Sequence, residues 1–238
     1  MKTPIAKRHF PYKHPTFGTK KNPKPPTAWQ GTVYYWWWQY LRRSDAYIRC
    51  CERGGKGRLA ALYQDFGDVR EDDFRTWWLK DSRGLRLFSE PRGQDDVRVV
   101  QQTDVVCDPS EALTISLPLY LPRRYLERNF KRILKELHPG KRGVQLAKQS
   151  RARYKVRGQP NTKALERGLL VYDRWIATGG PLWRVGNRIP GIHTTKKIYE
   201  NTDPYDALVF KRALAATVSR YLKRVKRTIK NTEQGLFP

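Results

Sequence analysis

Tryptophan is concentrated in one part of this chain, and that concentration constrains the fold more than any other feature. Six of the eight tryptophans lie between Trp29 and Pro91. The segment 29–110 that contains them carries 13 basic and 13 acidic side chains, so it has no net charge. Aromatic platforms that stack on nucleic-acid bases lie in basic grooves, whereas a neutral block of indole rings favours core packing. We therefore expect residues 29–110 to form an aromatic-rich helical domain.

The spacing of apolar residues predicts the helices of this domain. Aromatic and aliphatic residues recur at three- and four-residue steps over residues 34–51, and Gly54-Gly55 ends that helix. A second short helix is expected over residues 59–66. Asp68 is expected to cap a third helix, which carries the aromatic residues of segment 74–78 on its buried side.

The net charge of +26 is unevenly distributed along the chain. Residues 1–28 hold seven basic side chains and no acidic one, residues 111–163 hold 14 against 3, and residues 164–238 hold 14 against 6. A neutral block between a basic arm and a basic half is typical of a protein that binds a polyanion. Ribosomal RNA, DNA and anionic membrane all satisfy this pattern, so charge alone does not choose between them.

Two basic segments are predicted to lack helical structure. Residues 1–28 combine prolines with lysines and show no apolar periodicity, which indicates an extended or disordered basic arm. Residues 141–163 alternate basic and polar residues without an apolar stripe, so we expect a basic linker there.

A small β element is expected between these segments. Residues 97–107 and 113–119 have the alternation of strands, and an amphipathic helix follows over about 122–137, so that 111–140 forms a strand-helix unit. This order also resembles a ribbon-helix-helix, in which paired strands of a dimer enter the major groove. The second helix of such a fold would have to lie in residues 144–157, which carry no apolar stripe.

The strongest local pattern lies in residues 164–200. A helical stripe ends at Gly179-Gly180, a short helix begins at Pro181, and Pro190-Gly191 supplies a tight turn before a second short helix over 193–200. This order resembles the helix-turn-helix of bacterial regulators and recombinases. The stiff Pro190-Gly191 pair departs from the usual turn of that motif.

The resemblance implies roles for individual residues of this segment. Gly186 would let the two short helices cross closely, and Ile192 and Ile198 would lock their angle. The second helix would be the recognition helix, and Arg184 and Arg188 would contact phosphates. The residues that would face the major groove are Thr194, Thr195, Lys196 and Lys197. A helical hairpin with a solvated basic face accounts for the same pattern and stays open as the alternative.

A long basic helix is predicted over residues 203–231. Its apolar residues fall in one arc at 3.6 residues per turn, and the opposite arc is basic with no acid among its members. Solvated surface helices normally mix signs, because like charges one turn apart repel each other. The basic arc therefore indicates an anionic partner. The residues of this arc expected to bind DNA are Arg220, Lys223, Arg227 and Lys230.

A wider resemblance extends beyond the helix-turn-helix. The aromatic opening YYWWWQYLRRSDAYIRCCERGGKG and the C-terminal segment together resemble uncharacterised DNA-binding proteins of bacterial phages, plasmids and integrative elements. This resemblance implies a DNA-binding protein of a mobile element. It supplies no site residues.

Other chemistries have weaker sequence support. The dense acidic cluster of residues 65–73 would suit a Mg²⁺-dependent nuclease, yet most of its carboxylates lie where a helix begins and negative charge is favoured. The three cysteines and four histidines lack the spacing of metal ligands. No apolar stretch approaches the ~20 residues of a membrane span.

These observations lead to one interpretation of the whole chain. We expect a mainly α fold with a small β element, comprising an aromatic-rich helical N-terminal domain and, over residues 164–238, a helix-turn-helix domain. The predicted function is that of a cytoplasmic DNA-binding protein without enzymatic activity, cofactor or metal, acting in transcription regulation or as a DNA-bound accessory factor in recombination, transfer or packaging. An RNA- or ribosome-binding protein is the alternative, and homodimerisation stays open.

Overall fold

The computed structural model describes residues 10–19, 21–70, 73–90, 114–115, 117–137, 150, 152–192 and 203–238, and these residues are mainly helical. In chain order the helices are α1 (Thr27–Gln30), α2 (Val33–Leu41), α3 (Asp45–Glu52), α4 (Ala60–Phe66), α5 (Phe74–Leu79), the 3₁₀ turn η1 (Lys80–Ser82), α6 (Arg83–Phe88), α7 (Arg123–Leu137), α9 (Thr162–Thr178), α10 (Leu182–Asn187) and α11 (Pro204–Glu233). The expectation of a mainly α fold is confirmed.

The predicted β element is not seen in the described part of the chain. Residues 97–107 lie outside the described residues, and the described positions within 113–119 form no strand. The described β pairing consists of two isolated bridges, between Gly18 and Pro23 and between Val156 and Phe237.

The single helix predicted over residues 34–51 is two helices. α2 ends at Leu41 and α3 begins at Asp45, and the corner between them turns the chain. Ser44 makes this break, because its extended backbone and its Oγ, which accepts a hydrogen bond from the backbone N–H of Tyr47, form an N-cap. Continuous apolar spacing hid the break, since both helices bury residues in the same core.

The predicted cap of the third helix is also wrong. Asp73, not Asp68, caps α5, and its carboxylate accepts hydrogen bonds from the backbone N–H groups of Arg75 and Thr76 at 2.7 and 3.1 Å. Asp68 instead pairs with the guanidinium of Arg70, with an Oδ2 to Nη2 distance of 2.7 Å.

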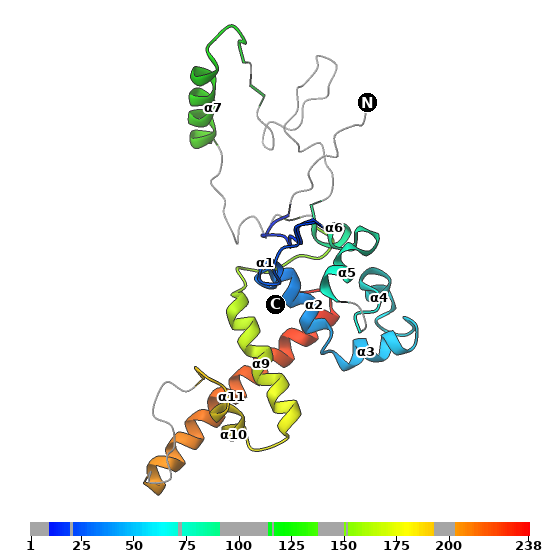
Figure 1. Ribbon diagram of the computed structural model, residues 1–238, viewed down its shortest axis with the longest axis vertical. Coiled ribbons are helices and arrows are strands. Elements are labelled where there is room, and N and C mark those ends of the chain that lie inside the picture. Colours follow the sequence, from blue (N-terminus) through cyan, green and yellow to red (C-terminus); the bar gives the residue numbers. More distant parts are fainter. Residues whose placement is uncertain are drawn as a thin grey trace.

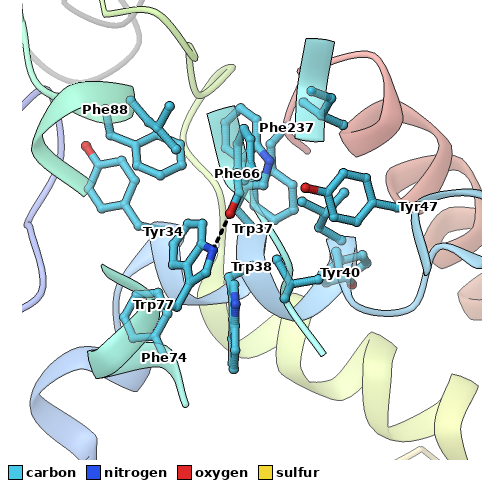
Figure 2. Packing of buried hydrophobic residues seen from close by; sticks show 14 of the residues in the cluster. Tyr34, Trp37, Trp38, Tyr40, Tyr47, Phe66, Phe74, Trp77, Phe88 and Phe237 are labelled. Carbon is cyan, nitrogen blue, oxygen red and sulfur yellow. Dashed lines mark hydrogen bonds between the residues drawn. The ribbon is translucent and has the colours of Figure 1, made fainter. Parts of the chain in front are cut away.

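An aromatic core fills the space between α2, α4, α5 and α6 (Figure 2). Trp37, which is fully buried, has ring contacts with Phe66 from α4 and Phe88 from α6. The indole N–H of Trp77 donates to the carbonyl oxygen of Phe66 at 2.7 Å. Tryptophan here therefore packs a core, as the neutral charge of the segment predicted.

The same core takes in residues from the predicted arm. Phe17 is buried, and the ring of Phe10 lies 6.0 Å from that of Trp78 in a stacked geometry. The hydroxyl of Tyr12 donates to the carbonyl oxygen of Gly158. Residues 10–19 and 21–28 are thus not the disordered arm that composition suggested, because their aromatic residues find partners on α2 and α5.

The predicted basic linker contributes to the core as well. Val156 is buried and bridges to Phe237, and Tyr154 packs edge-on against Phe66 with ring centroids 4.7 Å apart. Arg153 and Lys155 are exposed on either side of the half-buried Tyr154. A strand-like alternation of apolar and basic residues, rather than the helical period, therefore marks this segment.

A second, smaller core joins α9, α10 and α11. Its buried members are Val171, Val185, Ile189, Ile192, Leu214, Val218 and Leu222. α9 and α11 cross in Figure 1, and each also sends residues into the aromatic core. The aromatic block and the C-terminal helices are consequently parts of one packed body.

Polar contacts at the α2–α3 corner tie the two cores together. Arg43 forms a bidentate ion pair with Asp173 of α9, with Nε to Oδ1 at 2.6 Å. The Oγ of Ser44 donates to Glu233 at the end of α11 at 2.7 Å. One corner therefore holds both long C-terminal helices.

α7 stands apart from the other helices in Figure 1. The structure confirms this predicted helix but buries none of its side chains, and Leu137 is 61% exposed. Its expected inward face therefore packs on none of the described core.

Phe237 provides a test of the shared core. We expect Phe237→Ala to lower the free energy of unfolding by about 3–5 kcal/mol, because it empties a fully buried site next to Trp37 and Tyr40. Chemical denaturation followed by tryptophan fluorescence measures this loss. Leu236→Ala, at a half-buried neighbouring position, is the control. A tryptophan block that unfolds at the same denaturant concentration with or without Phe237 would contradict the shared core.

Candidate nucleic-acid interface

α11 carries four of the ten predicted binding residues. Asp203 caps it by accepting from the backbone N–H groups of Tyr205 and Asp206, and Pro204 suits its first turn. The predicted apolar arc is confirmed, since its residues pack on α2, α9 and α10. The buried residues of α11 are Leu214, Val218, Leu222, Val225, Thr228, Ile229 and Thr232.

The opposite side of α11 is a row of exposed cations. We define the α11 basic face as Arg212, Arg220, Lys223, Arg224, Arg227 and Lys230, all of which are exposed. The face contains the four residues of α11 predicted to bind DNA and adds Arg212 and Arg224. Arg224 was missed because it lies at the edge of the arc. At ~1.5 Å per residue the face extends over about 27 Å.

The charges of the α11 basic face are not neutralised within the described residues. The ion pairs found there involve other cations, and none joins this face to a carboxylate. Arg220 donates to the hydroxyl of Thr217 at 3.1 Å, which leaves its charge uncompensated. Lys223 and Arg227 are one turn apart, so their charges repel each other. An anion along the face would remove this repulsion.

Three cations outside the α11 basic face contact aromatic rings. The Nζ of Lys226 lies 4.4 Å from the ring centroid of Trp175 on α9. Trp183 on α10 lies between Lys211 and Arg184, at 4.9 and 5.4 Å from its ring centroid. Cation–π contacts keep these charges while fixing their positions. Sequence reasoning missed the contacts of Lys226 and Lys211, because these join helices whose packing the sequence does not show.

The two predicted phosphate-contacting residues of α10 do not join the α11 basic face. α10 packs on the side of α11 that carries Leu214 and Val218. At about 100° per residue, that side of the helix is nearly opposite Arg220 and Arg227. Arg184 and Arg188 are exposed on α10 and so form a separate basic site.

Gly186 lies in the contact between α10 and α11. A Cβ at this position would lie 2.6 Å from Cδ1 of Leu214 and 2.9 Å from Cγ2 of Val218. Gly186 therefore allows a close approach between α10 and α11.

The short helix and the turn predicted after Pro181 are seen in the described chain. α10 begins after Pro181, Gly191 turns the chain with φ of +75°, and Ile192 is buried against the second core. The expected recognition helix, with Thr194, Thr195, Lys196 and Lys197, lies outside the described residues.

The described carboxylates of the acidic cluster each bind a different group of the protein. Asp65 is buried, and its Oδ2 accepts from the hydroxyl of Tyr154 and lies 2.7 Å from the guanidinium of Arg153. Hydrogen bonds from Arg70 lower the pKa of Asp68, and those from Thr76 lower the pKa of Asp73. Glu71 and Asp72 lie outside the described residues.

Metal and thiol chemistry find little support in the described residues. No group of three or more histidine, cysteine or acidic side chains there is arranged to hold a metal ion. Burial raises the pKa of Cys51 to about 11, so this thiol is a poor nucleophile at neutral pH. None of the described helices is both long and apolar enough to cross a bilayer.

Comparisons with protein-family models, curated proteins and solved structures find no match to this chain. The function is therefore argued from the chain's own residues.

Gly186 tests the packing that positions α10 and α11. We expect Gly186→Ala to lower the free energy of unfolding by about 1–3 kcal/mol, because the new methyl group overpacks the contact with Leu214. Gly180→Ala is the matched control, since a Cβ there meets nothing closer than 3.8 Å. Thermal unfolding of both variants measures the difference. Equal stability of the two would show that α10 does not approach α11 closely.

Asp73 tests the structural interpretation of the acidic cluster. We expect Asp73→Ala to cost about 0.5–2 kcal/mol at neutral pH through loss of the cap, whereas Asp73→Asn keeps most of it. The pKa of Asp73 is lowered in the folded chain, so its ionised form stabilises the fold above the unfolded pKa of about 3.9, and this contribution is lost as pH falls through the folded pKa.

Denaturant unfolding at several pH values checks this expectation. The stability difference between the wild type and Asp73→Ala should shrink as the pH falls below about 4. A difference that stays constant down to full protonation would contradict a role for the ionised cap.

Proposed function

We propose that this protein binds nucleic acid through the α11 basic face, and that its partner is DNA. The observation that carries the proposal is a 30-residue helix whose exposed side holds six cations with no carboxylate partner among the described residues. A helix held on two packed cores resists bending, so these cations keep a fixed spacing. A regular polyanion suits such a row better than a small anion does.

Backbone contact is the chemistry that this face supports. Arginine and lysine bind phosphate oxygens, and each phosphate neutralised releases counterions, which supplies sequence-independent affinity. B-DNA carries one charge per ~3.4 Å of each strand, so a row about 27 Å long can meet several phosphates of one strand. The α11 basic face would thus position the protein on the duplex without reading its sequence.

Sequence selectivity would come from a different part of the chain. We assign it to the predicted recognition residues Thr194, Thr195, Lys196 and Lys197, and the phosphate contacts beside them to Arg184 and Arg188. Since Arg184 and Arg188 lie away from the α11 basic face, the protein would contact two stretches of backbone. A protein with these two features suits transcription regulation, or an accessory role in recombination, transfer or packaging of a mobile element.

Salt dependence of binding tests the proposal. Affinity falls as salt rises, with a slope of log affinity against log salt that steepens by about 0.9 for each phosphate neutralised. The variant Arg220→Gln/Lys223→Gln/Arg227→Gln should therefore make this slope shallower by up to about 2.7. Binding by fluorescence anisotropy at several salt concentrations measures the slope. The matched control, Lys13→Gln/Lys21→Gln/Lys80→Gln, removes three exposed lysines outside α11 and should leave more of the slope in place.

Two duplexes of equal length, one DNA and one RNA, separate the candidate partners. Tighter binding of RNA than of DNA at the same salt concentration would move the protein to the RNA-binding alternative. A slope that the α11 variant and the control change equally would remove the α11 basic face from the interface.

A further inference from the structure

A small pocket lies near the C-terminal end of α11, between α3 and the start of α4. Its volume is about 200 Å³, and it is lined by Ala46, Arg49, Cys50, Arg53, Arg58 and Leu59. Three of these six residues are arginines. The remaining three are small or apolar.

The chain builds this pocket by folding the loop after α3 back on the helix. The backbone N–H of Gly55 donates to the carbonyl oxygen of Cys50 at 2.8 Å, and the thiol of Cys50 points to the carbonyl oxygen of Lys56 at 3.6 Å. At Gly57 φ is +109°, and a Cβ there would lie 3.1 Å from Nη2 of Arg53. Glycine therefore lets this guanidinium lie close over the loop backbone.

The positive charge of the pocket exceeds what the surrounding structure neutralises. Arg58 lies 3.5 Å from Glu233, a long ion pair, and Glu233 also accepts from Ser44. Among the described residues neither Arg49 nor Arg53 has a carboxylate partner. The dipole of α3 favours cations at its last turn, which accounts for Arg49 and Arg53. It does not account for Arg58, which reaches the pocket from the other side of the loop.

We propose that Arg49, Arg53 and Arg58 form a binding site for a phosphate-class oxyanion. Guanidinium groups bind phosphate oxygens through paired N–H donors, and three of them around one cavity offer more donors than Glu233 can occupy. Ligand pockets for whole small molecules are typically about 300–1,000 Å³, so this smaller one suits an anionic group and not a nucleotide. The three arginines are exposed, so the pocket opens to solvent.

The phosphate has two sources, a nucleic-acid backbone or a free anion. Glu233 ends α11 and pairs with Arg58, so the pocket lies beside the last turn of the helix that carries Lys230, and a strand bound along that helix could reach it. Only the backbone source rests on the proposed function. The oxyanion site itself stands on the pocket and its arginines.

Calorimetric titration with inorganic phosphate and pyrophosphate, at constant ionic strength, tests the free-anion source. We expect Arg49→Gln/Arg53→Gln to weaken pyrophosphate binding by about tenfold or more, because the paired donors are removed. Arg53→Lys keeps the charge but not the paired donors, so its affinity for pyrophosphate should lie between those of the wild type and the double variant. The control Lys21→Gln/Lys80→Gln removes two exposed charges elsewhere and should bind like the wild type. Matching thermal unfolding of all variants shows that each is folded.

Anisotropy with a DNA duplex tests the backbone source on the same variants. If the pocket binds a backbone phosphate, Arg49→Gln/Arg53→Gln makes the slope of log affinity against log salt shallower by about 0.9 or more relative to the control. Loss of pyrophosphate binding with an unchanged slope supports the free-anion source. A variant that matches the control in both measurements overturns the site.

The two proposals fail in different ways. A protein that binds pyrophosphate through these arginines but no nucleic acid keeps the pocket and loses the proposed function. A salt slope that depends on the α11 basic face, with no effect of Arg49 and Arg53 in either measurement, keeps the proposed function and loses the pocket.

Discussion

The packing of Trp37 is the interaction on which the rest of the structure depends. Its fully buried ring contacts Phe66, Phe88, Tyr154 and Phe237, so residues from four distant parts of the sequence meet on one side chain. Large aromatic surfaces contribute more burial per residue than aliphatic ones, which suits a chain with only 39% hydrophobic residues. The basic surfaces can tolerate their own repulsion because this core holds the helices that carry them. Among the described residues, Asp65 and Arg83 are the charged side chains that this interior buries.

Sequence reasoning predicted helices well wherever one face is apolar and the other polar. The arc of α11 is the clearest case, since its buried residues keep the same period from Leu214 to Thr232 and a proline and an aspartate mark the start of the helix. It failed where a short-range hydrogen bond decides the end of one helix and the start of the next. Ser44 is the example, since it separates two helices whose apolar residues keep the same period. It failed again in residues 10–28 and 150–160, because proline and charge there conceal a few well-placed aromatic and aliphatic residues. Their burial depends on partners elsewhere in the chain, which local patterns do not reveal.

The candidate interface was predictable to the same degree. The cations of α11 recur with the helical period on the side opposite its apolar residues. The exposed row could therefore be identified from the sequence, apart from Arg224 at its edge. The separation of Arg184 and Arg188 from that row could not, because it follows from the contact of Gly186 with Leu214 on another helix. The arginine pocket is likewise invisible in the sequence, where Arg49, Arg53 and Arg58 belong to a segment without net charge. A fold can concentrate charge locally in a block that is neutral as a whole.

The position of Phe237 in the aromatic core has a consequence for biosynthesis. The ribosome makes Trp37 some two hundred residues before Phe237, whose ring stacks on it. The core around Trp37 therefore cannot be completed until most of the chain has been made. Contacts of such long sequence separation form slowly, and incomplete hydrophobic surfaces invite aggregation meanwhile. A nascent chain of this kind presents unburied tryptophans until its last residues are made, which is the kind of exposed apolar surface that chaperones protect. Its expression yield should therefore respond to translation speed and chaperone supply more than to the stability of the finished fold.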